Sequence, residues 1–145
     1  MNALQQAQDM LTEWVEAWTE PEENRLDAQV TPANLLSAVK ALDDHAWGYL
    51  VAITGLDAGV EAGTLEVLYH FCAGPAVLTL RVTIPREQAA VPSICTLIPY
   101  AGVFERELAE MFGIEVYGTP DPSRLFLPDD WPEGVYPLRK DTELD

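Results

Sequence analysis

Glu105, Arg106, Glu107 and Glu110 form the densest group of ionisable side chains in the sequence. Two carboxylates held together can serve as a general acid and a general base. Residues two positions apart on a helix point in different directions, however, so Glu105 and Glu107 do not readily share a substrate. Arg106 and Glu110 are four positions apart and can form an ion pair instead. A structural or interface role is therefore favoured over a catalytic one, and we expect no catalytic residue in the chain.

A metal site is the second kind of chemistry to consider, because His70 and Cys72 alternate along an expected strand and share one face. No second pair with ligand spacing follows, and His45 stands alone at the end of an expected helix. Zinc sites draw three or four ligands from such residues. Packing is therefore favoured for Cys72, and a metal is the weaker alternative. The sequence also lacks a glycine-rich phosphate loop and a nucleophile elbow, so we expect no cofactor.

Most basic residues lie in the C-terminal half, where Arg139, Lys140 and the earlier Arg124 form one basic cluster. A solvated chain end would account for it. Arginine and aromatic side chains are enriched at protein interfaces, however, and guanidinium groups can pair with the carboxylates of a partner. We therefore favour a docking strip, whose main anchors would be Leu125, Phe126, Trp131, Tyr136 and Arg139.

The elements that must position these residues follow from the spacing of apolar side chains. Apolar residues recur every three or four positions over 3–19, which predicts an amphipathic helix. Thr31-Pro32 is typical of a helix start, and this helix should run to about residue 44. A third helix should span 101–112 and end at Gly113. Strands are predicted at 26–30, 49–54, 64–72 and 76–84, the last two joined by a hairpin turn at 73–75.

This order of elements indicates an α+β fold of two layers, with a mixed or antiparallel sheet of about four strands packed by two or three helices. From Gly118 to Pro137 five prolines leave little scope for a helix or a central strand. Apolar and aromatic residues persist there, which argues against disorder. We therefore expect a core domain over residues 1–117 and a long, irregular, proline-rich docking tail over residues 118–145.

The composition limits the partners. The 145 residues contain 24 acidic and 8 basic side chains, a net charge of −16, which argues against nucleic acid and anionic membrane surfaces. Residues 1–72 hold 12 acidic and 2 basic side chains, and residues 73–145 hold 12 and 6. Two cysteines provide no disulfide framework, and neither a signal peptide nor a spanning apolar run is visible. We expect a cytoplasmic protein without direct membrane insertion.

Five blocks of sequence follow one another over about residues 104–141. They are Glu105 to Ile114 (ERELAEMFGI), Gly118 to Asp121 (GTPD), Arg124-Leu125, Leu127 to Trp131 (LPDDW) and Pro137 to Asp141 (PLRKD). Together they resemble the thirty-kilodalton subunit family of respiratory complex I, which is the C subunit of NADH–quinone oxidoreductase. This family includes the matching subunit of energy-converting membrane-bound [NiFe]-hydrogenases and of formate hydrogenlyase.

The resemblance implies a scaffolding subunit of the peripheral arm of an electron-transport complex, with no cofactor of its own. Its partners would be neighbouring peripheral-arm subunits and the large catalytic subunit, of the forty-nine-kilodalton type or the [NiFe]-hydrogenase type. The complex would hold it at the inner face of the cell membrane. By match of motif, one docking region would be the ERE helix, Glu105, Arg106 and Glu107. The other would be the strip formed by Pro137, Leu138, Arg139, Lys140 and Asp141.

Departures from the family pattern favour the hydrogenase branch. Phe104 stands where many respiratory members have Trp, Thr119 stands where they have His, and the spacing from Trp131 to Pro137 is closer to hydrogenase-type members. Two other functions stay open: a free-standing carboxylate-based enzyme, and a soluble interaction module outside any redox complex. An isolated chain could also form a homodimer through an exposed tail.

Overall fold

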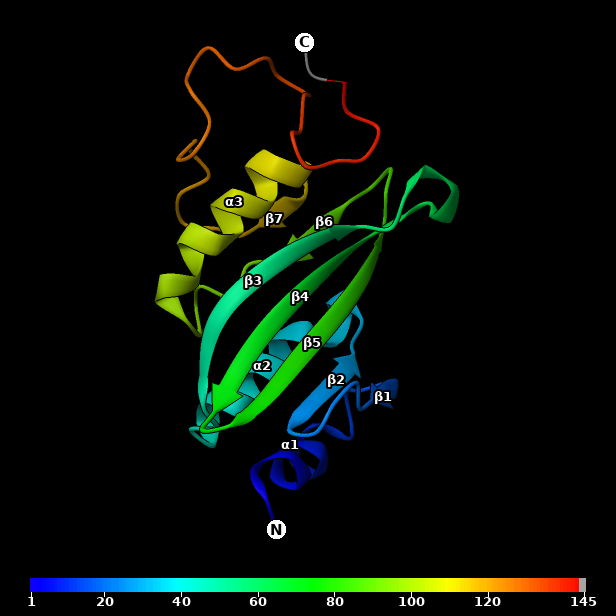
Figure 1. Ribbon diagram of the computed structural model, residues 1–145. Coiled ribbons are helices and arrows are strands. Elements are labelled where there is room, and N and C mark those ends of the chain that lie inside the picture. Colours follow the sequence, from blue (N-terminus) through cyan, green and yellow to red (C-terminus); the bar gives the residue numbers. More distant parts are fainter. Residues whose placement is uncertain (144–145) are drawn as a thin grey trace.

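A five-stranded mixed sheet forms the centre of the computed structural model, which describes residues 1–143 (Figure 1). The strand order is β1-β2-β5-β4-β3. β2 and β5 pair in parallel, and the other neighbouring strands are antiparallel. The strands are β1 (Ala17–Thr19), β2 (Arg25–Gln29), β3 (Tyr49–Asp57), β4 (Thr64–Ala73) and β5 (Ala76–Pro85).

Alternation of apolar residues makes one face of this sheet the core. In β4, Leu65, Val67, Tyr69 and Phe71 are at most 2% exposed, and the residues between them are half-buried. Successive side chains of a strand point to opposite faces, so the intervening residues line the other face. The tight turn between β4 and β5 places Gly74 at a φ of +58°, a conformation that glycine adopts readily.

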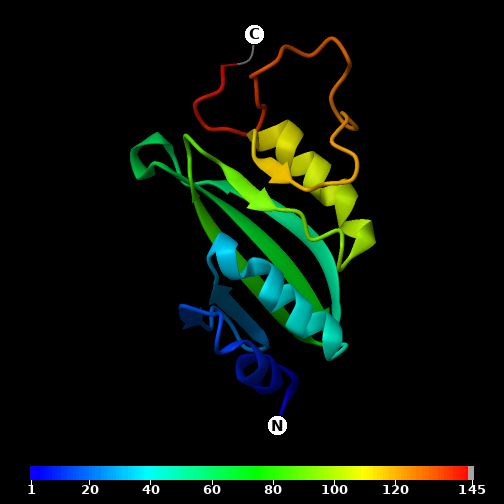
Figure 2. The ribbon, with the colours of Figure 1, turned by 180° about the vertical axis from the view of Figure 1, so that it is seen from behind.

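The helices pack on the apolar face of the sheet. α1 (Ala3–Leu11) and α2 (Pro32–Asp44) contact β5, and α3 (Gly102–Phe112) contacts β3. Figure 2 shows α2 lying across the sheet, whereas the face turned to the viewer in Figure 1 is not covered by a helix of the described chain. Thr31 precedes the start of α2, and Gly113 ends α3 with a φ of +68°, so both expected helix ends are confirmed.

The helix expected over residues 3–19 is wrong in its length, because α1 ends at Leu11. The Thr12 hydroxyl donates to a backbone carbonyl one turn earlier, and the chain then turns. It continues as β1, in which Trp18 lies opposite Ala28 of β2. The apolar spacing thus spans two successive elements, and pairing with β2 overrides the helical period.

Two further differences concern strands. β3 continues to Asp57, three residues beyond its expected end. A small parallel sheet of β6 (Ala90–Pro92) and β7 (Glu115–Tyr117) was not expected at all. Three-residue strands are too short to show the alternation by which a strand is recognised in sequence. This second sheet joins the segment before α3 to the segment after it.

The α+β class is confirmed, with five strands in the main sheet where about four were expected. Residues 118–143, called the tail from here on, contain neither helix nor strand. The division between a core domain over 1–117 and a docking tail over 118–145 stays a prediction, and residues 144–145 lie outside the described residues. Within residues 1–143, no helix has both the length and the apolar character needed to cross a membrane.

Candidate docking surface

The tail runs along α3 and then returns toward the loop between β3 and β4, as Figures 1 and 2 both show. Four sets of polar contacts hold it to the rest of the chain. They involve Arg106, Glu110, the C-terminal end of α3, and an ion cluster around Asp57. The expected docking residues of the tail therefore lie on a segment that is fixed to its own chain.

Arg106 holds the start of the tail. Its guanidinium donates to the carbonyls of Ser123 and Arg124 at 2.8 and 3.1 Å, and it lies 3.6 Å from a carboxylate oxygen of Asp121. The hydroxyl and the N–H of Ser123 both donate to Asp121 and lower its pKa, so this carboxyl stays charged beside the guanidinium. The ion pair with Glu110 that the spacing allows is not formed, because Arg106 binds the tail instead.

Glu110 holds the next part of the tail. Its carboxylate accepts hydrogen bonds from the N–H groups of Leu125 at 2.7 Å, Phe126 at 3.0 Å and Leu127 at 3.3 Å. Three successive N–H groups around one anion form a backbone nest. Glu110 is 8% exposed, whereas the side chains of Leu125 and Phe126 are 44% and 47% exposed. The nest thus fixes the backbone where two apolar side chains face solvent.

Arg124 and Trp131 shape the loop that follows. The guanidinium of Arg124 donates to the carbonyls of Pro128 and Trp131 at 2.9 and 2.8 Å. The indole N–H of Trp131 donates to the carbonyl of Val135 at 2.8 Å. These bonds lie within the tail, so both side chains stabilise its shape. An open cleft of about 390 Å³ remains between this loop and α3.

The tail also closes the C-terminal end of α3, where helices leave carbonyls without intrahelical partners. The N–H of Leu138 and the Nε–H of Arg139 donate to the carbonyls of the last two residues of α3, at 3.0 and 2.6 Å. The ring of Tyr136 packs on Gly113, and the guanidinium carbon of Arg139 lies 5.1 Å from the ring centroid. This distance is within cation–π range.

A buried ion cluster anchors the end of the tail. The guanidinium of Arg86 donates to both carboxylate oxygens of Asp57 and to Asp141, and the N–H of Lys140 donates to Asp57 at 2.7 Å. Asp57 and Arg86 are 4% and 9% exposed. Hydrogen bonding from Arg86, helped by the N–H groups of Lys140 and Gly59, holds the pKa of Asp57 well below its usual range despite burial. The same bond to Asp57 raises the pKa of Arg86, so both groups stay charged.

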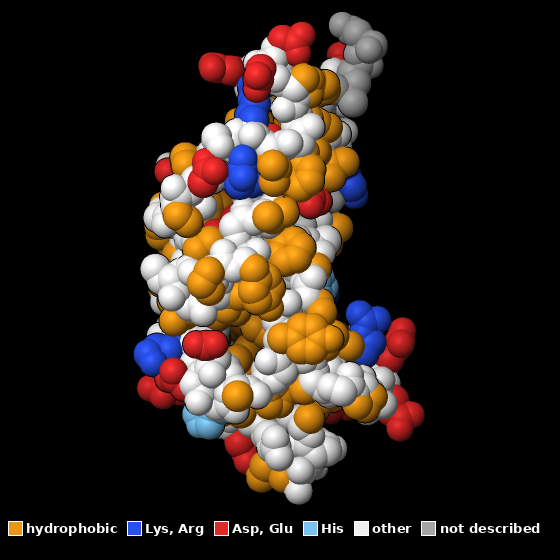
Figure 3. All heavy atoms as spheres, turned by 90° about the vertical axis from the view of Figure 1, so that its left-hand side faces the viewer, with side chains coloured by type: hydrophobic (Ala, Val, Ile, Leu, Met, Phe, Trp, Pro, Cys, Tyr) orange, Lys and Arg blue, Asp and Glu red, His pale blue; other side chains and the backbone are white. Residues whose placement is uncertain are grey.

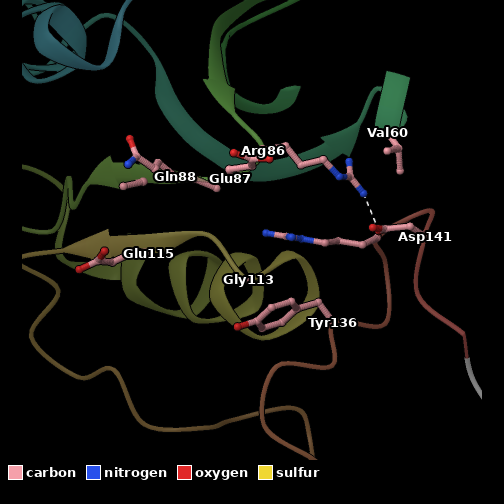
Figure 4. A pocket seen from close by; sticks show the side chains of 11 residues that line it. Val60, Arg86, Glu87, Gln88, Gly113, Glu115, Tyr136 and Asp141 are labelled. Atoms are coloured by element: carbon pink, nitrogen blue, oxygen red, sulfur yellow. Dashed lines mark hydrogen bonds and ion pairs between the residues drawn. The ribbon is translucent and has the colours of Figure 1, made fainter. Parts of the chain in front are cut away.

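An open cleft of about 810 Å³ lies beside this cluster (Figure 4). Arg86 reaches Asp141 across one end of it, and Tyr136 and Gly113 line the side formed by the tail and α3. The lining mixes two arginines with three carboxylates: Arg86, Arg139, Glu87, Glu115 and Asp141. This mixture of charges selects no single class of ligand.

Glu105 and Glu107 have different surroundings although both belong to the ERE block. Glu105 is 1% exposed, and its oxygens accept hydrogen bonds from the Ser93 hydroxyl, the Ile94 N–H and the Cys95 thiol at 2.7, 2.8 and 3.0 Å. Burial, aided by Glu105, raises the pKa of the Cys95 thiol, which therefore remains a donor. Glu107 is exposed. Glu105 thus supports the turn before α3 and has no surface left for a partner, which corrects its expected docking role.

The uncovered face of the sheet holds His70 and Cys72, both half-buried. The ring nitrogens of His70 lie 2.9 Å from the Thr79 hydroxyl and 3.1 Å from the Thr54 hydroxyl. Burial lowers the pKa of His70, which favours the neutral ring. Among residues 1–143 no three His, Cys, Asp or Glu side chains lie together as a metal site would require, so the metal alternative gains no support.

The expected docking residues differ in exposure. Leu125, Phe126 and Leu138 are 44–52% exposed, and Lys140 and Asp141 are also exposed. The half-buried members are Arg106, Arg124, Trp131, Tyr136, Pro137 and Arg139. Figure 3 shows hydrophobic side chains gathered on one face of the molecule, and the apolar residues exposed outside the tail include Tyr49, Tyr100 and Val103, at 50–62%. The apolar surface is therefore wider than the tail.

The sequence did not predict the role of three residues that hold the tail: Glu110, Asp57 and Arg86. For Glu110 the spacing indicated only that it could pair with Arg106. Asp57 and Arg86 are 29 residues apart in the chain, and no local pattern marks either of them. A lone Asp in an expected loop and a lone Arg after a strand give no signal until the fold brings them together.

Comparison with known proteins gives a consistent result. A model of the family described as "Respiratory-chain NADH dehydrogenase, 30 Kd subunit" matches residues 28–145. Membrane-bound hydrogenase subunit beta of Pyrococcus furiosus is 38% identical over 109 residues, which are 74% of this chain and 62% of that protein. The C subunit of NADH-quinone oxidoreductase from Ruegeria pomeroyi is 40% identical over 121 residues, 80% of this chain and 59% of that protein. The chain thus spans less than two thirds of the length of these curated relatives.

A solved structure shares the fold. It is described as that of the membrane-bound sulfane sulfur reductase, an archaeal respiratory membrane complex. The match has a TM-score of 0.82 and 22% sequence identity, and it covers 97% of this chain and 85% of that one. This likeness concerns the fold alone, and it includes almost the whole of the chain.

Proposed function

Because the chain belongs to the family described as "Respiratory-chain NADH dehydrogenase, 30 Kd subunit", we propose that it is a non-catalytic scaffolding subunit of a complex I-like oxidoreductase. In this proposal it docks on the large catalytic subunit, of the forty-nine-kilodalton or [NiFe]-hydrogenase type, beside other peripheral-arm subunits. The reaction and its cofactors then belong to those partners. We propose further that the complex holds the chain at the inner, cytoplasmic face of the membrane.

The observation that carries this proposal is the exposure of Leu125, Phe126 and Leu138 on a tail that polar contacts hold to its own chain. Exposed apolar side chains on a fixed backbone lose little conformational entropy when a partner covers them. Isolated exposed leucines are common on protein surfaces, but three anchors within one ordered segment favour an interface.

The carboxylate-enzyme alternative is disfavoured by the surroundings of Glu105. A general acid or base needs access to its substrate. Glu105 is 1% exposed and accepts three hydrogen bonds, and Glu107 is exposed to solvent. Residues two positions apart on a helix also point in different directions. The two carboxylates therefore do not share a cleft.

We also propose that the chain belongs to the hydrogenase branch of the family and not to the respiratory branch. The identities of this chain to the two relatives are nearly equal, at 38% for the membrane-bound hydrogenase protein and 40% for the NADH-quinone oxidoreductase protein. The assignment thus depends on the spacing from Trp131 to Pro137, together with Phe104 and Thr119.

The test is capture of the large subunit by variants of the full chain. We expect Leu125→Ala/Phe126→Ala/Leu138→Ala to lose most of the captured large subunit, because aromatic and apolar anchors dominate interfaces. Leu36→Ala is the matched control, since Leu36 is 38% exposed on α2, away from the tail. Equal thermal melting of both variants and the unaltered chain should accompany the result. Undiminished capture by the triple variant would overturn the proposed docking site.

A further inference from the structure

Glu110 and the residues that it binds show an unusual contrast in burial. Glu110 is 8% exposed, and its carboxylate accepts hydrogen bonds from three backbone N–H groups. Two of these N–H groups belong to Leu125 and Phe126, whose side chains are nevertheless 44% and 47% exposed. Such bonds to an ionised acceptor are among the stronger hydrogen bonds in proteins. A strong polar contact therefore fixes a segment that gains little from burying its own apolar side chains.

The N–H groups of residues 125–127 belong to no helix or strand that could bind them. Residues 118–143 form neither helix nor strand, and Pro122 and Pro128 flank the nest without donating backbone hydrogen bonds. Arg106 and Arg124 hold carbonyls on either side of these residues. Without Glu110, however, the N–H groups of residues 125–127 would turn to water, and the backbone between those contacts would have to become ordered when a partner binds. Ordering a loop at that moment lowers affinity, and preorganising it raises affinity.

The charges of the same segment indicate the partner's chemistry. Arg106 and Arg124 are engaged within the chain. The exposed charges that follow Leu125 and Phe126 in sequence are acidic instead: Asp129, Asp130 and Glu133. A complementary surface would offer an apolar pocket with basic side chains at its rim.

We propose that Glu110 is a positioning residue for docking: it holds Leu125 and Phe126 ready to enter an apolar, basic-rimmed pocket on the large subunit. This inference rests on the proposed function and adds to it the residue that prepares the contact and the kind of surface that receives it. Glu110 itself would not touch the partner.

Affinity for the co-expressed large subunit, measured well below the melting temperature, tests the inference. We expect Glu110→Gln to weaken binding by about tenfold or more, because a neutral amide cannot hold the three N–H groups as a carboxylate does. Glu13→Gln is the matched control, since it makes the same change at an exposed position beyond the end of α1, outside the expected docking residues, and it should change affinity by less than about threefold.

A double-mutant cycle separates positioning from a general loss of stability. In a Leu125→Ala/Phe126→Ala background, Glu110→Gln should add little further loss, because the side chains through which it acts are gone. Amide hydrogen exchange at residues 125–127 of the full chain should also be faster in Glu110→Gln than in Glu13→Gln.

The outcomes are distinguishable. If the unaltered chain does not bind the large subunit, the proposed function itself fails. If the unaltered chain binds and Glu110→Gln binds equally well, or loses the same factor in both backgrounds, Glu110 does not position the anchors and this inference is overturned.

Discussion

The sheet core and the tail are stabilised by different kinds of interaction. The core buries apolar side chains such as Leu35, Leu78 and Leu80, each 0% exposed, between the sheet and its helices. The tail is held by hydrogen bonds and ion pairs to Arg106, Glu110 and Asp57, and it leaves several apolar side chains in solvent. The core is thus stabilised by the hydrophobic effect, and the tail by polar contacts of fixed geometry.

This difference bears on the docking role that we propose for the irregular tail. Polar contacts hold several backbone groups of the tail, which lies outside the helices and strands of the described chain. Its apolar side chains then remain available for another surface. Covering them with the chain's own core would have stabilised the fold but removed the proposed anchors.

Arg86→Ala should produce the largest effect, because it breaks the cluster where core and tail meet. Asp57 is 4% exposed and would be left charged without its guanidinium partner. Removing one member of a buried ion pair typically costs about 3–5 kcal/mol. Urea unfolding should show this loss, and proteolysis should show earlier cleavage in the tail. A change of less than about 1 kcal/mol would mean that water reaches Asp57.

Two leucine substitutions, one in the core and one in the tail, test the difference in burial between these regions directly. Leu80→Ala should lower the free energy of unfolding by about 2–5 kcal/mol, because it leaves a cavity at a fully buried site. Leu138→Ala, at 52% exposure, should lower it by less than about 0.5 kcal/mol. Chemical denaturation of the two variants provides the comparison. Similar losses would show that Leu138 is packed in solution, and the contrast between the regions would fail.

Gly113→Ala tests the contact between α3 and the tail with a smaller change. The φ of +68° alone should cost about 1–2 kcal/mol for a residue with a side chain. The added Cβ would also overlap the ring of Tyr136, so the tail must shift. We expect a modest fall in melting temperature with a clear rise in hydrogen exchange at residues 136–139. Unchanged exchange there would mean that the tail adapts without leaving α3.

Acid should weaken the ion cluster that joins the core to the tail, because this cluster depends on the charged form of Asp57. The pKa of Asp57 is lower in the folded chain than the usual value of about 3.9, so its contribution to stability is present above that pH. This contribution is lost as the pH falls below about 3.9 toward the folded-state pKa. The free energies of unfolding of the unaltered chain and Asp57→Asn should therefore converge as the pH falls from about 5 to 2. A difference that stays constant over this range would exclude Asp57 as the cause.

Much of the fold could be predicted because its signals are local. The start of α2 at Thr31-Pro32, the end of α3 at Gly113 and the hairpin of β4 and β5 all follow from short sequence patterns. The end of α1 could not, because Trp18 continues the helical spacing while belonging to a strand. Pairing with β2 decided that case, and pairing depends on residues that the local pattern does not include.

The proposed docking surface was predictable in composition but not in arrangement. Arginine and aromatic enrichment marked the segment that contains Phe126, Trp131 and Arg139. It did not show that Arg139 closes α3, or that Trp131 and Arg124 bond within the tail. Composition states what a segment can contact, and it leaves open whether the partner is the same chain or another.

The sequence alone determined the α+β class, most of the elements, and the segment whose residues resemble the thirty-kilodalton subunit family, because periodicity, caps and motifs are properties of neighbouring residues. Only the tertiary structure decided which of those residues face solvent. It buried Glu105, bound Glu110 to the backbone of residues 125–127, and joined Asp57, Arg86 and Asp141 although they lie far apart in the chain. Burial and pairing depend on which distant groups the fold brings within hydrogen-bonding distance, and no local pattern encodes that choice.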